Sequence, residues 1–94
     1  MVEKIRFIPR IELTNDDDTK CVWDLGLNRS KKEAIKAVKK EYSRIKKGEW
    51  DDILSKEDKK NGYYLNPVIV SCNLTKDNEI YDFLNWYDLD GNLI

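Results

Sequence analysis

The sequence predicts a two-layer α+β fold in which one amphipathic helix packs on a four-stranded, largely antiparallel sheet, in the order ββαββ. Three observations lead to this prediction. Apolar residues alternate with period two in four segments, they recur with helical spacing in one segment, and turn residues separate these segments. Because 94 residues is the length of one domain, we expect a single α+β domain over residues 1–94.

The first two segments are predicted to form a β-hairpin. Residues 4–13 alternate, and the apolar face of this strand consists of Ile5, Phe7, Pro9, Ile11 and Leu13. Proline cannot donate a ladder hydrogen bond, so we expect this strand to lie at a sheet edge or to be irregular at Pro9. Residues 14–19 have the composition of a turn, and residues 20–27 resume the alternation.

The helix is predicted to begin at Ser30, because Ser30 and Glu33 have the spacing of a capping box. Its apolar stripe consists of Ile35, Val38, Tyr42 and Ile45, and Gly48 is a plausible end. A further short helical turn is expected between Trp50 and the turn at Asn61-Gly62, because a long structureless loop would be unusual in so small a domain.

The last two strands are predicted over residues 64–74 and 79–89, with a turn between them and Asp90-Gly91 as a hairpin turn after them. The third strand has an apolar face made of Val68, Val70, Cys72 and Leu74. In the fourth, simple alternation points Ile80, Leu84 and Trp86 one way and Tyr81, Phe83, Tyr87 and Leu89 the other. A helix is the alternative for residues 79–89, since their apolar residues also fit helical spacing.

Composition argues against most enzyme classes. The chain has no histidine, which excludes Ser-His-Asp and Cys-His catalysis and histidine metal ligands. Two cysteines are too few for a thiolate zinc site, and Cys21 and Cys72 are expected to be small buried thiols on the apolar faces of their strands. We therefore expect no enzyme activity, no metal and no cofactor. The sequence contains no apolar stretch of membrane-spanning length and no signal peptide, so we expect a cytoplasmic protein without membrane contact.

The near-neutral net charge of −1 conceals an uneven distribution. Residues 29–47 carry nine basic and two acidic residues, whereas residues 48–94 carry four basic and ten acidic residues. Helical geometry gathers the basic side chains on one face, which is a candidate partner-binding surface made of Lys32, Lys36, Lys39, Lys40, Arg44 and Lys47. This face is solvated, neutralised by the chain's own acidic segments, or bound to an anionic partner.

A second candidate surface lies on the fourth predicted strand, because both of its faces are apolar and one helix can cover only one of them. Exposed aromatic residues with charges around them are typical of protein interfaces. The candidate residues are Tyr81, Asp82, Phe83, Tyr87 and Asp88. Homodimerisation through this strand is an alternative use of the same residues.

The segment Asp88-Leu89-Asp90-Gly91-Asn92-Leu93-Ile94 resembles the first motif of the haloacid-dehalogenase-type phosphatases, with Asn92 in place of that motif's threonine. That resemblance implies a nucleophile at Asp88, a general acid at Asp90 and a magnesium ion. The chain ends at residue 94, without the later residues that this family needs, and an Asp-Gly hairpin turn is the stronger interpretation.

The leading hypothesis is a small non-enzymatic, intracellular protein-binding module. A more specific version is an inhibitor of a larger nucleic-acid-handling protein, of the phage anti-defence or anti-CRISPR type, whose acidic segments 49–58 and 77–90 mimic nucleic acid. The alternative is a nucleic-acid-binding protein that uses the lysine-rich helix face. The scarcity of arginine and of aromatic residues among these lysines favours a protein partner.

Overall fold

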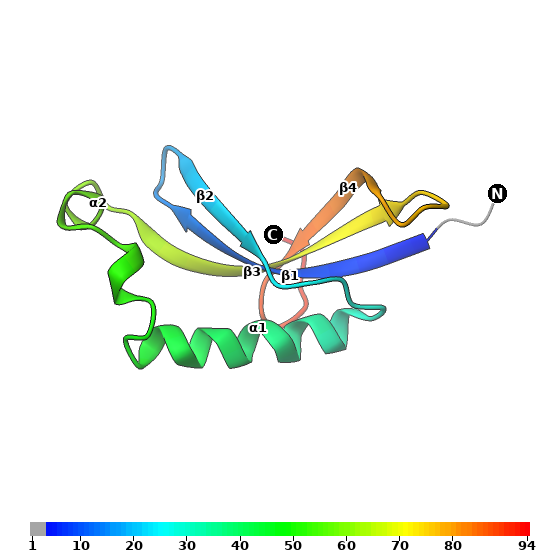
Figure 1. Ribbon diagram of the computed structural model, residues 1–94, viewed down its shortest axis with the longest axis horizontal. Coiled ribbons are helices and arrows are strands. Elements are labelled where there is room, and N and C mark those ends of the chain that lie inside the picture. The colour runs from blue at the N-terminus through cyan, green and yellow to red at the C-terminus, as the bar shows by residue number, and fades with distance from the viewer. Residues whose placement is uncertain (1–3) are drawn as a thin grey trace.

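A computed structural model describes residues 4–94 and confirms the α+β fold (Figure 1). The elements are β1 (Lys4–Thr14), β2 (Thr19–Asp24), α1 (Lys31–Lys46), the 3-10 turn η1 (Asp51–Ile53), α2 (Lys56–Lys60), β3 (Tyr64–Leu74) and β4 (Ile80–Tyr87). The strands form one antiparallel sheet in the order β2-β1-β3-β4. The fourth segment is therefore a strand, and the helical alternative for it is wrong.

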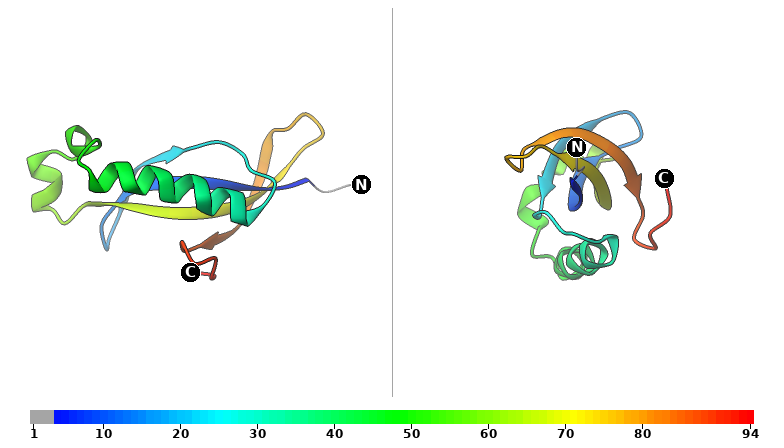
Figure 2. Two further views of the ribbon diagram at one scale, coloured as in Figure 1. Left: turned by 90° about the horizontal axis from the view of Figure 1, so that it is seen from below. Right: turned by 90° about the vertical axis from the view of Figure 1, so that its right-hand side faces the viewer.

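The two edge strands flank opposite halves of a long central pair. β1 and β3 pair over their whole lengths, whereas β2 reaches only as far as Arg10 on β1 and β4 only as far as Ile69 on β3. Figure 1 shows β2 and β4 rising away from α1 at the two ends of the sheet, and Figure 2 shows α1 along the other side of the central strands. The result is an elongated molecule measuring 48 × 24 × 24 Å.

Both prolines of the chain lie in the central strands, so the expectation of an edge position for Pro9 is wrong. Leu25 donates its N–H to the Pro9 carbonyl, which shows that the Pro9 backbone points toward β2. There the β1–β2 ladder ends, and the chain leaves it at Gly26 with a φ of 116° before rejoining at Asn28. Alternation along β3 likewise points Pro67 outward, just beyond the last residue paired with β4. The N–H that each proline lacks would therefore lie beside a position where the neighbouring edge strand has already ended.

One face of the sheet is covered by α1, and we call it the helix-covered face. Its buried cluster joins Ile11 and Ile69 of the central strands to Ala34 and Val38 of α1, all fully buried. Ser30 caps α1 as predicted, and its hydroxyl accepts the Glu33 N–H at 3.1 Å. Of the predicted apolar stripe, Val38 is fully buried and the other members are partly buried.

The opposite face also has a buried apolar floor, although none of the helices within residues 4–94 lies on it. This floor consists of Ile8, Val68, Val70, Cys72 and Leu74. The predicted shared face of these β3 residues is confirmed, and burial raises the pKa of the Cys72 thiol. Cys21 is exposed, contrary to expectation, because it lies on edge strand β2 while α1 packs on β1 and β3.

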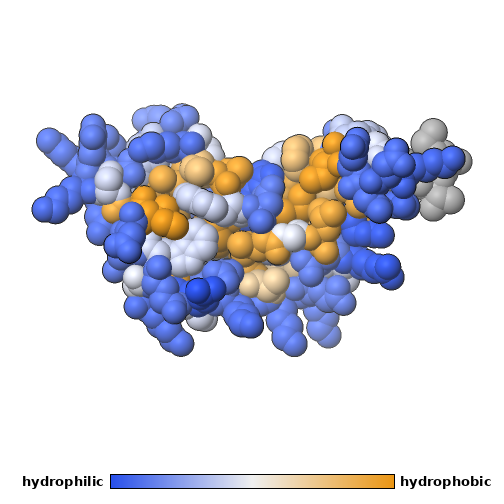
Figure 3. Space-filling view, in the orientation of Figure 1, coloured by the Kyte–Doolittle hydropathy of each residue, from blue (hydrophilic) through white to orange (hydrophobic). Residues whose placement is uncertain are grey.

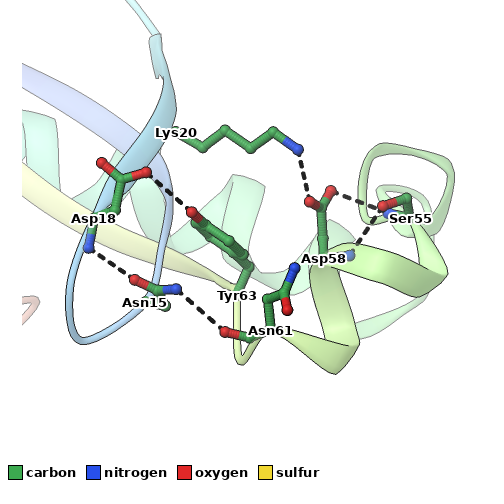
Figure 4. Close-up of polar contacts among 7 residues, drawn as sticks. All are labelled: Asn15, Asp18, Lys20, Ser55, Asp58, Asn61 and Tyr63. Atoms are coloured by element: carbon green, nitrogen blue, oxygen red, sulfur yellow. Dashed lines mark hydrogen bonds and ion pairs between the residues drawn. The ribbon is translucent and has the colours of Figure 1, made fainter.

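Short α2 is fastened to the β1–β2 turn by polar contacts (Figure 4). The buried Asp58 carboxylate accepts a hydrogen bond from the Lys20 ammonium at 2.6 Å and completes a capping box with Ser55. The Tyr63 hydroxyl donates to Asp18 at 2.9 Å, and the Asn15 side-chain amide donates to the Asn61 carbonyl at 3.2 Å. The expected helical turn after Gly48 is thus present as η1, and α2 is an additional helix.

Candidate functional site

Two irregularities in β4 change which of its side chains share a face. The register against β3 shifts between Ser71 and Cys72 and again between Asn73 and Leu74. The Ser71 hydroxyl lies at the first shift, where it accepts the Asn85 N–H at 3.1 Å. As a result Phe83 and Trp86 lie on the same face, with ring centroids 6.2 Å apart. The predicted strict alternation, which put them on opposite faces, is therefore wrong.

Exposed apolar side chains surround the floor on the face without a helix. Val22 of β2 and Ile80, Phe83 and Trp86 of β4 are each 38 to 43% exposed. Between the two strands lies the Arg10–Asp24 ion pair, at 2.7 Å, and the Arg10 guanidinium stacks over Phe83 at 5.3 Å. We call Val22, Ile80, Phe83, Trp86, Arg10 and Asp24 the helix-free surface. Figure 3 shows a dip between the raised ends of the molecule, with apolar residues on both sides.

The structure does not bring together the five residues predicted on the fourth strand. Phe83 belongs to the helix-free surface, but Tyr81 lies at a register shift and Asp82 opposes Asn73. Tyr87 packs against the helix-covered cluster, where the Lys31 ammonium lies 4.6 Å from its ring centroid. Val22, Ile80 and Trp86 were missing from the predicted set, although the exposed aromatic character of this strand was predicted.

Asp88 forms a turn. Its Oδ1 accepts the N–H groups of Asp90 and Asn92, both at 2.9 Å, and Gly91 has a positive φ of 85°. The Lys31 ammonium donates to the Gly91 carbonyl at 3.0 Å and holds this turn against the start of α1. These contacts support the hairpin interpretation of the Asp-Gly dipeptide over the phosphatase-like one.

The predicted basic face of α1 is present on the outer side of the helix. Its six residues, Lys32, Lys36, Lys39, Lys40, Arg44 and Lys47, are all exposed. Arg44 is paired with Glu41 at 2.9 Å and with Glu49 at 3.0 Å, and these carboxylates raise its pKa. The five lysines have no ion-pair partner among residues 4–94. They form a row along a helix about 24 Å long.

The described part of the chain offers few other kinds of site. None of the helices within residues 4–94 is long and apolar enough to cross a membrane. No group of three or more metal-ligating side chains occurs in the same range. Comparisons with protein families, with curated proteins and with solved structures found no significant match.

Proposed function

We propose that the protein is a non-enzymatic protein-binding module that contacts its partner through the helix-free surface. The observation that carries this proposal is the cluster of half-exposed apolar side chains, Val22, Ile80, Phe83 and Trp86, around a buried floor. Large aromatic side chains supply most of the energy of protein interfaces when a partner removes them from water.

The ion pair at the centre of this surface suggests the chemistry of the partner. Arg10 and Asp24 already neutralise each other through two hydrogen bonds, of 2.7 and 3.3 Å. A partner therefore needs no opposing charge at this point, and apolar side chains that enter the dip suit it best. Asp24 keeps a half-exposed carboxylate that can accept a hydrogen bond at the rim of the contact.

In its finer form, the proposal is an inhibitor or accessory subunit of a nucleic-acid-handling protein, of the anti-defence or anti-CRISPR type. The acidic segments 49–58 and 77–90 would then act as a nucleic-acid mimic. Asp51 and Asp52 follow the C-terminal end of α1, while Asp77 and Glu79 lie in the β3–β4 turn toward the other end of the 48 Å long axis (Figure 1). A basic channel would have to contact both ends, with the helix-free surface between them.

Affinity purification from the native host, followed by mass spectrometry, tests the proposal. The wild type should recover a stoichiometric protein partner, and the double variant Phe83→Ser/Trp86→Ser should lose it while keeping the wild-type circular dichroism spectrum. Tyr81→Ser is the matched control, because Tyr81 is a more exposed aromatic residue of the same strand. Recovery of no stoichiometric partner, or equal recovery by the double variant, would contradict the proposal.

A second candidate function is nucleic-acid binding through the row of five exposed lysines on α1. Like-charge pairs at four-residue spacing destabilise a helix unless something compensates them, and a phosphate backbone would do so. The variant Lys36→Glu/Lys40→Glu should then weaken DNA or RNA binding and reduce its dependence on salt. Lys59→Glu/Lys60→Glu, which changes two exposed lysines of α2, is the control. Unchanged affinity across a salt series would exclude this role for α1.

A further inference from the structure

An open sheet edge is a template for pairing with another strand unless something blocks it. Three stretches of edge in this sheet are blocked in whole or in part. Beyond the ladder with β2, Phe7 of β1 exchanges two backbone hydrogen bonds with Asn28, both at 2.8 Å. The part of β3 beyond β4 contains Pro67, which has no N–H to donate. The outer edge of β4 is irregular and is partly occupied by the C-terminal residues, because Ile94 donates its N–H to the Trp86 carbonyl at 3.0 Å.

The outer edge of β2 has no such block between Cys21 and Asp24. The ladder with β1 is regular over these residues, and no strand within residues 4–94 pairs with their other side. Leu25 donates its N–H to the Pro9 carbonyl, so alternation along the strand directs the N–H and C=O of Val22 away from β1. The backbone of Val22 is therefore free to pair with a further strand.

We propose that the occupant of this edge is a second copy of the chain, which adds its own β2 in antiparallel orientation around Val22. The sequence of β2 is complementary to itself in this register. Val22 faces Val22 of the second copy, and Lys20 faces Asp24 in both directions. Opposite charges across an antiparallel pair are stabilising, whereas a register centred on Cys21 would put Asp24 against Asp18 of the other copy.

Lys20 and Asp24 already form ion pairs within the chain, and each can still make this further contact. Lys20 is bound to Asp58 and Asp24 to Arg10, yet the Lys20 and Asp24 side chains remain 53% and 40% exposed. Lysine has three N–H donors and a carboxylate has about four acceptor positions, so each group can take a further partner. In the dimer, the Asp58–Lys20 pair of one copy would thus join the Asp24–Arg10 pair of the other copy. Each side of the interface would then carry one continuous row of alternating charges.

The two-fold axis of such a dimer is perpendicular to the sheet, as isologous pairing of two edge strands requires. Both helix-free surfaces then lie on one side of a sheet of twice the width, and both α1 helices lie on the other side. The dimer would present two copies of each candidate surface in a fixed arrangement.

Sedimentation velocity over a concentration series tests this inference. The wild type should show a concentration-dependent dimer, and Val22→Lys should raise its dissociation constant by roughly 30-fold, because two ammonium groups would face each other. Val22→Thr keeps a β-branched residue at the same exposed position and should dimerise like the wild type. A wild type that stays monomeric up to about 1 mM, or a Val22→Lys variant that dimerises normally, would overturn the inference.

Disulfide trapping tests the register. In a Cys21→Ser background, Val22→Cys should form a disulfide-linked dimer on mild oxidation, because paired residues of adjacent strands lie within disulfide reach. Lys36→Cys in the same background is the control, since it places an exposed thiol on α1. Failure of Val22→Cys to crosslink, together with a Cys21–Cys21 disulfide between copies of the wild-type chain under the same oxidation, would overturn the Val22-centred register, because that register puts Cys21 opposite Trp23.

Discussion

The two faces of the sheet bury their centres equally and by different means. On the helix-covered face, Ile69 is fully buried beneath α1, and on the other face Ile8 is 1% exposed without a helix above it. The second cluster lies within the coil of the sheet, beside long side chains: Arg10 is paired with Val68 of the cluster and Phe83 with Cys72, and the Arg10 guanidinium lies over the Phe83 ring. A rigid layer completes one core, whereas half-exposed side chains complete the other. The burial of a residue at the centre of a sheet face therefore does not show whether a rigid layer or half-exposed side chains lie above it.

The largest expected losses of stability come from truncating one buried isoleucine at the centre of each face of the sheet. Truncating a buried isoleucine costs about 2 to 5 kcal/mol, depending on how far the site can relax. We expect Ile69→Ala to lie near the upper end of this range, because α1 and the central strands hold the cavity open. Ile8→Ala should lie near the lower end, because the side chains above it can collapse into the space. Urea unfolding measures both, and a greater loss for Ile8→Ala would contradict the comparison.

A smaller effect on stability is expected at the Lys20–Asp58 ion pair, which joins β2, at the border of the helix-free surface, to α2. The hydrogen bond from Lys20 lowers the pKa of Asp58. A carboxyl group whose pKa is lower in the folded state than in the unfolded state, where it is about 4, stabilises the folded protein when the pH is above the unfolded-state pKa. This contribution is lost as the pH falls through the folded-state pKa. Unfolding free energies measured from neutral to acidic pH should therefore decline below about pH 4. Asp58→Asn should show a weaker decline, and an identical decline would show that this pair does not hold β2 to α2.

The smallest expected effect concerns the outer side of the helix-covered face. Lys40 forms like-charge pairs with Lys36 and Arg44 at four-residue spacing, and Lys40→Glu converts both into opposite-charge pairs. Each pair is worth about 0.2 to 0.5 kcal/mol, so the variant should be more stable by roughly 1 kcal/mol. Thermal unfolding at low and high salt measures the gain, which salt should reduce by screening. A loss of stability would mean that Lys40 contributes a contact within the fold.

The sequence predicts the elements better than their arrangement. The bounds of β3 and the cap of α1 follow from local patterns, namely alternation over residues 64–74 and the Ser30–Glu33 spacing. The five-residue helix α2 has no apolar periodicity, because its only buried residue is the charged Asp58. The edge position of β2, and with it the exposure of Cys21, depends on the pairing of β1 with β3, which lie far apart in the chain.

The two candidate surfaces also differ in how well the sequence predicts them. The basic face of α1 could be predicted because helical periodicity is regular and the helix has no insertion. The helix-free surface could not, because each register shift in β4 reverses the side to which the following residues point. Phe83 and Trp86 are three residues apart and still share a face, an arrangement that strict period-two alternation forbids.

The placement of the two prolines has a consequence for cooperativity. Each marks the point where an outer strand stops, so the sheet consists of two hairpins that share only the β1–β3 ladder and the helix packed across it. Either hairpin tip can open without breaking hydrogen bonds in the other, while the middle of the ladder opens only when the whole molecule unfolds. Amide exchange should therefore slow from both ends toward the residues around Pro9 and Ile69, which makes the centre of the long axis the last part of the protein to lose its structure.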